Sequence, residues 1–181
     1  MCGIYGIISK HSDIVNKSIN ALYDLEYRGY DSSGIAFINE KDKAITTYKC
    51  TGKIDNLKQS ITDKEINTNT LIAHTRWATH GKISTNNAHP HTTDNIAIVH
   101  NGILTNFEEL KSKLNDYNFY GECDSEIIAK LIDYHLMNLT TNNIKKSTLK
   151  SNIYLKAFCL AINELKGSYA IACIFKDEPN T

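Results

Sequence analysis

The 181-residue sequence has few prolines, no excess of charge of either sign and no long apolar run. Proline occurs at two positions, 90 and 179, and no linker rich in proline, glycine or serine divides the chain. The longest apolar run, Tyr169–Phe175, is too short to span a bilayer. The 20 Lys and Arg residues balance the 20 Asp and Glu residues, which argues against a nucleic-acid or membrane-surface partner. We therefore expect one domain, or a piece of one, that binds neither nucleic acid nor a membrane surface.

The cysteines are few and irregularly spaced. There are five, an odd number, and no two form a Cys-X-X-Cys pair, so neither a disulfide framework nor a thiolate zinc site is predicted. The N-terminus lacks the basic segment and apolar stretch of a signal peptide, so we expect a cytoplasmic protein. An apolar fraction of 41% with 22% charged residues is enough for a packed core rather than disorder.

Hydrophobic periodicity predicts a mixture of strands and helices. Short apolar runs rich in β-branched residues predict strands at residues 3–9, 33–39, 44–50, 71–75, 95–101 and 168–175. Apolar residues at helical spacing predict four helices. Three begin after Ser12, Asn106 and Asp124, and the apolar face of the fourth ends at Leu165. Asn106 with Glu109 three residues later is typical of a helix N-cap. This order favours sheets that are covered by helices.

Cys2 directly follows the initiator methionine. A small residue at this position allows Met1 to be removed, which leaves a cysteine that carries a thiol and a free α-amine. The ordinary pKa is about 7.7–8.0 for an α-amine and about 8.5 for a thiol, so the amine can accept the thiol proton at neutral pH. Nucleophile and base then lie on one residue. Alone this signal is weak, and its weight depends on the other motifs.

Two segments place an arginine beside glycines. Residues 27–34 read YRGYDSSG, and we expect Gly29 to be the left-handed cap of a tight turn that holds Arg28 near a site. Residues 74–81 read HTRWATHG and come directly after a predicted strand. Arg76 can hold a substrate carboxylate with its guanidinium fork, and Trp77 can cover that ligand. The alternative is that Arg76 pairs with an acidic neighbour and Trp77 belongs to the core.

Two further segments lie at element ends. Residues 99–103 read VHNGI, and Asn101-Gly102 is ordinarily a hairpin turn. A side-chain amide beside an unhindered backbone N–H is also what an oxyanion hole requires. Residues 121–126 read GECDSE and open a predicted helix. Asp124 is either the helix N-cap or a carboxylate that binds a substrate ammonium group, and one residue can have both roles.

Taken together and in this order, the motifs resemble the class II glutamine amidotransferases. The resemblance covers residues 2–181 and rests on the segments CGI, YRGYDSSG, HTRWATHG, NAHPH, HNG and CDSE. It implies an α+β fold, the αββα four-layer sandwich of N-terminal-nucleophile hydrolases, here incomplete at the C-terminus. The RGYDS and RWATHG segments are similar to those of the branch that makes glucosamine 6-phosphate from fructose 6-phosphate. The resemblance implies one glutaminase domain over residues 2–181, glutamine as the substrate and no cofactor.

The same resemblance implies roles for the residues that carry the chemistry. Cys2 would attack the side-chain amide of glutamine and release ammonia, and the γ-glutamyl thioester would then be hydrolysed to glutamate. Asn101 and Gly102 would stabilise the tetrahedral oxyanion. Arg28 would lie near the nucleophile and support the site without a chemical step.

Substrate binding is implied for a second set of residues. Arg76 would hold the α-carboxylate of glutamine, with help from Thr79 and His80. Asp124 would bind the α-ammonium group. Trp77 would belong to a loop that covers the bound glutamine.

The family's domain continues beyond the position that matches Thr181, and two sugar-isomerase domains follow it. We therefore expect a truncated domain without the sugar-isomerase part. Two hypotheses stay open: a glutamine-hydrolysing domain, whose partner could be a downstream chain with those domains, and an inactive or partner-dependent fragment. Residues 139–152 read as a polar insertion, and we expect a surface loop there without a function.

A third hypothesis comes from the histidines. Five of the seven lie between positions 74 and 100, namely His74, His80, His89, His91 and His100. Such clustering can bind zinc, but this stretch contains no cysteine and a single carboxylate, Asp94. We therefore rank a metal-binding module last.

Overall fold

The computed structural model describes residues 2–10, 13–78, 81–141 and 150–178. Its elements, in chain order, are β1 (Gly3–Ile8), α1 (Ile14–Leu25), the 3-10 helix η1 (Glu26–Arg28), β2 (Ser32–Ile38), β3 (Ile45–Thr51), α2 (Ile54–Ile61), β4 (Thr70–Arg76), β5 (His91–Thr92), β6 (Ile96–Leu104), α3 (Phe107–Lys113), α4 (Ser125–Thr141), α5 (Lys150–Glu164) and β7 (Gly167–Phe175).

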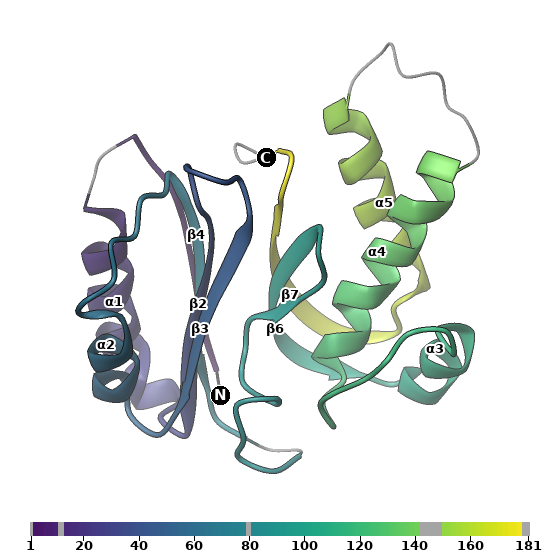
Figure 1. Cartoon of the computed structure of the whole chain (residues 1–181). Coiled ribbons are helices and arrows are strands. Elements are labelled where there is room, and N and C mark those ends of the chain that lie inside the picture. The colour runs from purple at the N-terminus through teal and green to yellow at the C-terminus, as the bar shows by residue number, and fades with distance from the viewer. Residues whose placement is uncertain (1, 11–12, 79–80, 142–149, 179–181) are drawn as a thin grey trace.

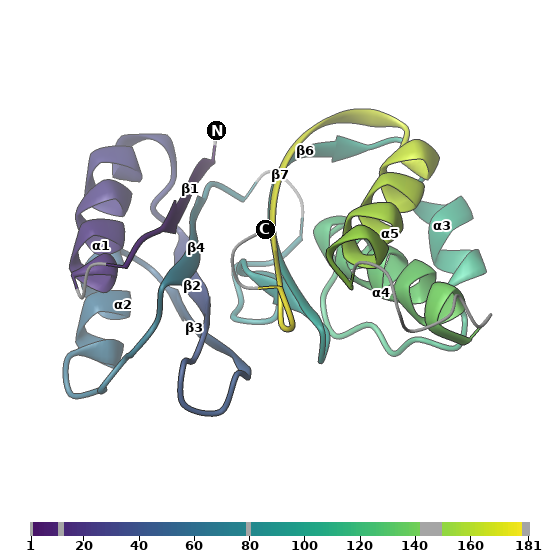
Figure 2. The same ribbon diagram turned by 90° about the horizontal axis from the view of Figure 1, so that it is seen from above.

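These elements form four layers (Figure 1). One antiparallel sheet has the strand order β1-β4-β2-β3, and the other has the order β5-β6-β7. Helices α1 and α2 cover the outer face of the first sheet, and α4 and α5 cover that of the second, as the view from above in Figure 2 also shows. The αββα sandwich that the resemblance implies is therefore present.

Strand β2 shows how the sequence builds these layers. All seven of its residues are buried, because it is a central strand with one face toward the helices and the other toward the second sheet. Ile35 and Phe37 pack with α1 and α2, whereas Ala36 and Ile38 pack with strands of the second sheet. Successive side chains of a strand point to opposite faces, so a strand that is covered on both faces reads as a continuous apolar run.

The same period places polar side chains at the ends of two strands. In β4, Ile72 faces the second sheet, so His74 and Arg76, which follow at intervals of two, lie on that face. In β6, Val99 faces the first sheet, so Asn101 points into the space between the sheets. His100 has the opposite parity and faces the helical layer. Two strands that are far apart in sequence thus bring polar groups into the same interior space.

All six predicted strands and four predicted helices are confirmed, with boundaries that differ by a few residues. The prediction did not include α2, the two-residue strand β5 or the short helix η1. Helix α2 has only eight residues, and its buried side chains Ile54, Leu57 and Ile61 are interrupted by polar ones. Its apolar face becomes visible once the helix is known to pack on the first sheet. In the described part of the chain, no helix is long and apolar enough to cross a membrane.

Two local expectations are wrong, and a third is confirmed only in position. Asn106 is the N-cap residue of α3, as predicted, but its side chain makes no capping bond; its amide instead donates to the Glu164 carbonyl and accepts from the Lys166 N–H, at 2.9 and 3.0 Å. Gly29 has a φ of −177° and is extended rather than left-handed. The polar stretch 139–152 is not one loop, because its first three residues belong to α4 and its last three to α5. Residues 142–149 lie outside the described part of the chain.

Candidate functional site

A cavity of about 330 Å³ opens where the ends of β4 and β6 meet the start of α4. This volume is in the range of a small-molecule site. Its walls contain six of the residues that the sequence singles out, namely Cys2, Arg76, Trp77, Asn101, Gly102 and Asp124. The other wall residues are His89, His100, Ile103, Leu104, Phe107, Glu122, Cys123 and Ser125.

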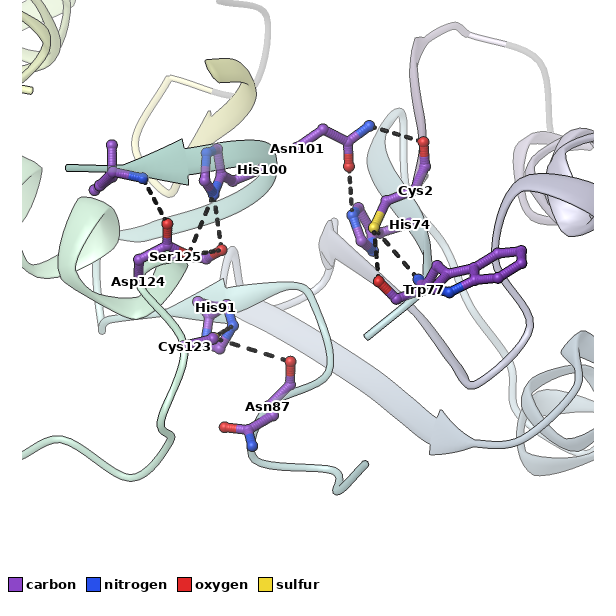
Figure 3. A network of polar contacts seen from close by, with 11 residues as sticks. Cys2, His74, Trp77, Asn87, His91, His100, Asn101, Cys123, Asp124 and Ser125 are labelled. Carbon is purple, nitrogen blue, oxygen red and sulfur yellow. Dashed lines mark hydrogen bonds and ion pairs between the residues drawn. The ribbon is translucent and has the colours of Figure 1, made fainter. Parts of the chain in front are cut away.

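Cys2 lies directly before β1, at the end of the first sheet. The Trp77 N–H donates to the Cys2 sulfur at 3.3 Å, and the Cys2 thiol lies 3.7 Å from the Trp77 carbonyl oxygen (Figure 3). The next residue, Gly3, pairs with Thr75 in the sheet, and its N–H donates to the Thr75 hydroxyl at 3.2 Å. The sheet therefore holds Cys2 beside the end of β4.

Trp77 is at the mouth of the cavity. Its side chain is 44% exposed, so the interpretation of this residue as core is wrong. Its ring lies 5.4 Å from that of Tyr30. The Asp31 carboxylate accepts a hydrogen bond from the N–H of Ala78, and the Asp31 N–H donates to the Arg76 carbonyl at 3.2 Å. The YRGYDSSG segment thus anchors the backbone on both sides of Trp77.

Arg76 is the last residue of β4 and is almost fully buried. One guanidinium nitrogen, Nη1, lies 3.4 Å from the Lys82 carbonyl oxygen. A buried guanidinium in a cavity wall can supply the bidentate donors that a carboxylate needs.

Asn101 and Gly102 do not form a hairpin turn. Both lie within β6 and pair with Ala170 and Tyr169 of β7. Gly102 has a φ of +143°, and a β-carbon at this position would lie 2.0 Å from the Ser168 carbonyl oxygen. Only glycine therefore fits here, and its backbone lies next to the Asn101 amide in the cavity wall.

Asp124 lies just before α4. Its Oδ2 accepts a hydrogen bond from the Leu104 N–H at 2.8 Å, and none of the described bonds joins its side chain to a backbone N–H of α4. His100 approaches the other oxygen at 4.0 Å and its Nδ1 lies 2.8 Å from the Ser125 hydroxyl. Burial lowers the pKa of His100, and the Asp124 carboxylate partly offsets this. The imidazole is thus neutral at neutral pH and does not form a full ion pair with Asp124.

The segment before Asp124 is held by a buried ion pair. The Glu126 carboxylate accepts from the N–H groups of Tyr120 and Gly121, at 3.0 and 2.8 Å. Lys130 pairs with this carboxylate, contacts the Asn118 carbonyl and lies over the Phe119 ring at 4.3 Å. Helix α4 therefore fixes the loop that delivers Asp124 to the cavity.

Three predicted site residues are not placed in this cavity. Arg28 belongs to η1 and is absent from the described cavity wall. Thr79 and His80 lie outside the described residues. Three of the clustered histidines contact one another through their rings: the His89 ring lies 4.1 Å from that of His74, at a tilt, and meets that of His91 edge to face at 4.7 Å. Within the described ranges, no three His, Cys, Asp or Glu side chains are arranged to hold a metal ion.

Sequence reasoning gave no specific role to several residues that the structure brings to the site. Ser125 bonds His100, and Cys123 lies 3.0 Å from the Nε2 atom of His91. Burial raises the pKa of the Cys123 thiol, which makes it a poor nucleophile. The NAHPH segment was a signal for His89 and His91, but their partners come from other parts of the chain.

The fold and cavity can be compared with known proteins. The chain matches the model of the class-II glutamine amidotransferases over residues 1–171. It is 45% identical to the glutamine–fructose-6-phosphate aminotransferase (isomerizing) of Buchnera aphidicola subsp. Baizongia pistaciae and 41% identical to that of Acinetobacter baylyi, over 99% of this chain. The match to the Helicobacter pylori enzyme is 44% over 97% of this chain. The chain spans only 27–28% of the length of these relatives.

Solved structures agree with the sandwich. The glutamine phosphoribosylpyrophosphate amidotransferase of B. subtilis, solved with ADP and GMP, superposes with a TM-score of 0.74 over 97% of this chain and 35% of its own. A structure described as the allosteric regulatory enzyme of purine biosynthesis gives 0.75 over 97% and 36%. Both are 23% identical to this chain, so they show the N-terminal-nucleophile hydrolase fold alone. On the family match and the relatives above, the chain belongs to the class-II glutamine amidotransferases.

Proposed function

We propose that this chain hydrolyses the side-chain amide of glutamine, with Cys2 as the nucleophile. One observation carries the proposal: a single cavity has in its walls the Cys2 sulfur, the Asn101-Gly102 pair, and the opposite charges of Arg76 and Asp124. A nucleophile, an oxyanion site and a pair of charges that can bind an α-amino acid are the parts that this reaction needs.

The reaction would proceed in two steps. After removal of Met1, the α-amine of Cys2 accepts the thiol proton, and the sulfur attacks the amide carbon of glutamine. The resulting oxyanion accepts hydrogen bonds from the Asn101 side-chain amide and the Gly102 N–H, and one such donor is worth about 2.7–4 kcal/mol. The C–N bond then breaks, and the amine returns its proton to the leaving ammonia. Water next attacks the γ-glutamyl thioester and releases glutamate and the thiol.

Recognition of glutamine would use the charged ends of the cavity. Arg76 would bind the α-carboxylate through its guanidinium fork, with Thr79 and His80 as further contacts, and Asp124 would bind the α-ammonium group. Trp77, exposed at the mouth, would cover the bound amino acid. Arg28 would act as a support that does not touch the reacting atoms.

The use of the ammonia follows from the relatives. Their printed name describes transfer to fructose 6-phosphate with isomerization, and this chain corresponds to about a quarter of their length. We propose that this domain supplies the nitrogen for glucosamine 6-phosphate when it acts with sugar-isomerase domains on a longer or separate chain. All five cysteines are free thiols, which suits the reducing cytoplasm.

A direct experiment is to measure glutamate and ammonia release from glutamine by the purified protein. Cys2→Ala should reduce release to the uncatalysed rate. Cys159→Ala is the matched control, because Cys159 is exposed on α5 and is not among the cavity-wall residues, so the rate should stay unchanged. Full activity of Cys2→Ala would overturn the proposal.

A further inference from the structure

The side-chain amide of Asn101 bridges the ends of the two sheets. Its Nδ2 donates to the backbone carbonyl of Cys2 at 3.0 Å, and its Oδ1 lies 2.9 Å from Nε2 of His74 (Figure 3). The amide nitrogen has two N–H groups, so one remains for a ligand in the cavity that Asn101 lines. His74 therefore contacts the amide oxygen, which cannot donate a hydrogen bond.

Donor and acceptor types determine the state of this pair. Oδ1 of an amide can only accept, so Nε2 of His74 must carry a proton. If the amide were turned over, its oxygen would face the Cys2 carbonyl oxygen, and two acceptors would be in contact. The turned amide would also require a bare Nε2 on His74. The tautomer of one imidazole thus decides which end of the Asn101 amide faces the nucleophile.

The surroundings of His74 favour one fixed imidazole. Its side chain is fully buried, and burial lowers its pKa to about 4, so it is neutral at neutral pH. The His89 ring packs against it at 4.1 Å. Gly34 is its neighbour on β2, and a β-carbon there would lie 2.3 Å from the His89 carbonyl oxygen. Glycine at position 34 therefore leaves space for the segment that contains His89, so that the His89 ring can pack against His74.

We infer that His74 is a positioning residue for the oxyanion donor: its Nε2–H holds Oδ1 of Asn101, so that Nδ2 points to Cys2 and to the carbonyl that Cys2 attacks. This inference rests on the proposed function, in which Asn101 donates to the oxyanion. His74 lies outside the described cavity wall and takes no part in bond making or breaking. Its effect should therefore appear in the rate of the chemical step and not in the binding of glutamine.

The kinetic test compares three variants of the protein. His74→Leu removes the donor and should lower kcat for glutamine hydrolysis about 10- to 100-fold, with KM changed less than about twofold. His74→Gln can place an amide N–H near the position of Nε2 and should recover most of this loss. The double variant His74→Leu/Asn101→Ala should be no slower than Asn101→Ala alone, because His74 acts through Asn101.

The outcomes separate the two proposals. If Asn101→Ala keeps the wild-type kcat, the oxyanion role in the proposed function is wrong. If Asn101→Ala is slow but the His74→Leu loss multiplies with it, or appears mainly in KM, the positioning role is wrong. Nitrogen-15 NMR of the histidine-labelled wild-type protein tests the tautomer without any variant. A proton bonded to Nε2 of His74 supports the inference, whereas a proton on Nδ1 overturns it even if the variants fail to fold.

Discussion

Gly29 lies against the backbone of Arg76, so close that a β-carbon at position 29 would come within 2.7 Å of the Arg76 carbonyl carbon and 2.9 Å of the Trp77 nitrogen. The glycine is therefore required by space and not by backbone conformation, since its φ is extended. The contact presses the segment after η1 onto the end of β4, where Arg76 enters the cavity wall and Trp77 contacts Cys2.

Gly29→Ala should destabilise the protein by about 1–3 kcal/mol, because rigid backbone atoms must move to admit the methyl group. Glutamine hydrolysis should fall with it, since the same shift displaces Arg76 and Trp77. Gly6→Ala is the matched control, as the nearest atom to its added β-carbon is Ile72 Cγ2 at 3.9 Å. Urea titration gives the free energy of unfolding of both variants, and equal values would contradict the steric explanation.

Lys130→Met should cost about 3–5 kcal/mol of unfolding free energy, because it leaves the Glu126 carboxylate buried without its cation. The two side chains are 7% and 6% exposed. Lys166→Met is the control, since its pair with Glu109 is 66% exposed on both sides and should contribute about 1 kcal/mol or less. Denaturant titration measures both losses, and similar losses for the two lysines would show that the buried pair does not hold the loop before Asp124.

Stability should fall as the pH is lowered from about 6.5 toward 5. Burial lowers the pKa of His74 to about 4 and those of His89 and His91 well below the ordinary 6.5. In this window the unfolded chain therefore binds protons that the folded protein does not. Each buried histidine contributes stability that is fully present above pH 6.5 and lost at up to about 1.4 kcal/mol per pH unit below it.

His89→Phe should make this slope shallower by up to about 1.4 kcal/mol per pH unit. Phenylalanine keeps the ring contact with His74, and neither ring nitrogen of His89 has a hydrogen-bond partner among the described residues. Unfolding free energies at pH 5.0, 5.5, 6.0 and 6.5 give the slope. An unchanged slope would mean that His89 does not stay neutral in the folded protein.

Asp124→Asn should raise KM for glutamine about 10- to 100-fold with a smaller effect on kcat, since it removes a charge-assisted hydrogen bond to the α-ammonium group. The asparagine oxygen can still accept from the Leu104 N–H, which limits damage to the fold. A glutamine analogue without the α-amino group is the control substrate, because wild type and variant should process it equally. If both substrates lose equally, Asp124 does not bind the ammonium group.

The partnership of His74 and Asn101 shows how much of the site can be predicted from sequence. Each residue lies at the end of an apolar run, so the period of two assigns each side chain to a strand face. The two residues are 27 positions apart, and their contact depends on how the two sheets pack. Local sequence patterns do not predict that packing. The order of the motifs was enough to identify the family, but it does not show which side chains contact one another.

Other features depend on close approach between distant segments. Gly29 and Gly34 read as turn or strand glycines, but each is required by a backbone segment that lies far away in sequence, near Arg76 and His89. Helix α2 was missed because its apolar face is short and becomes evident only against the sheet that it covers. Local patterns therefore predict elements and faces well, whereas contacts between layers need the three-dimensional structure.

The most direct test of the central claim is to trap the nucleophile. The purified protein is treated with a glutamine analogue that carries an electrophilic ketone in place of the side-chain amide, and the labelled peptide is identified by mass spectrometry. We predict one label per chain, on Cys2, in a peptide that begins with Cys2 because Met1 has been removed. A label on Cys50 or Cys159, or active protein that still carries Met1, would contradict the account.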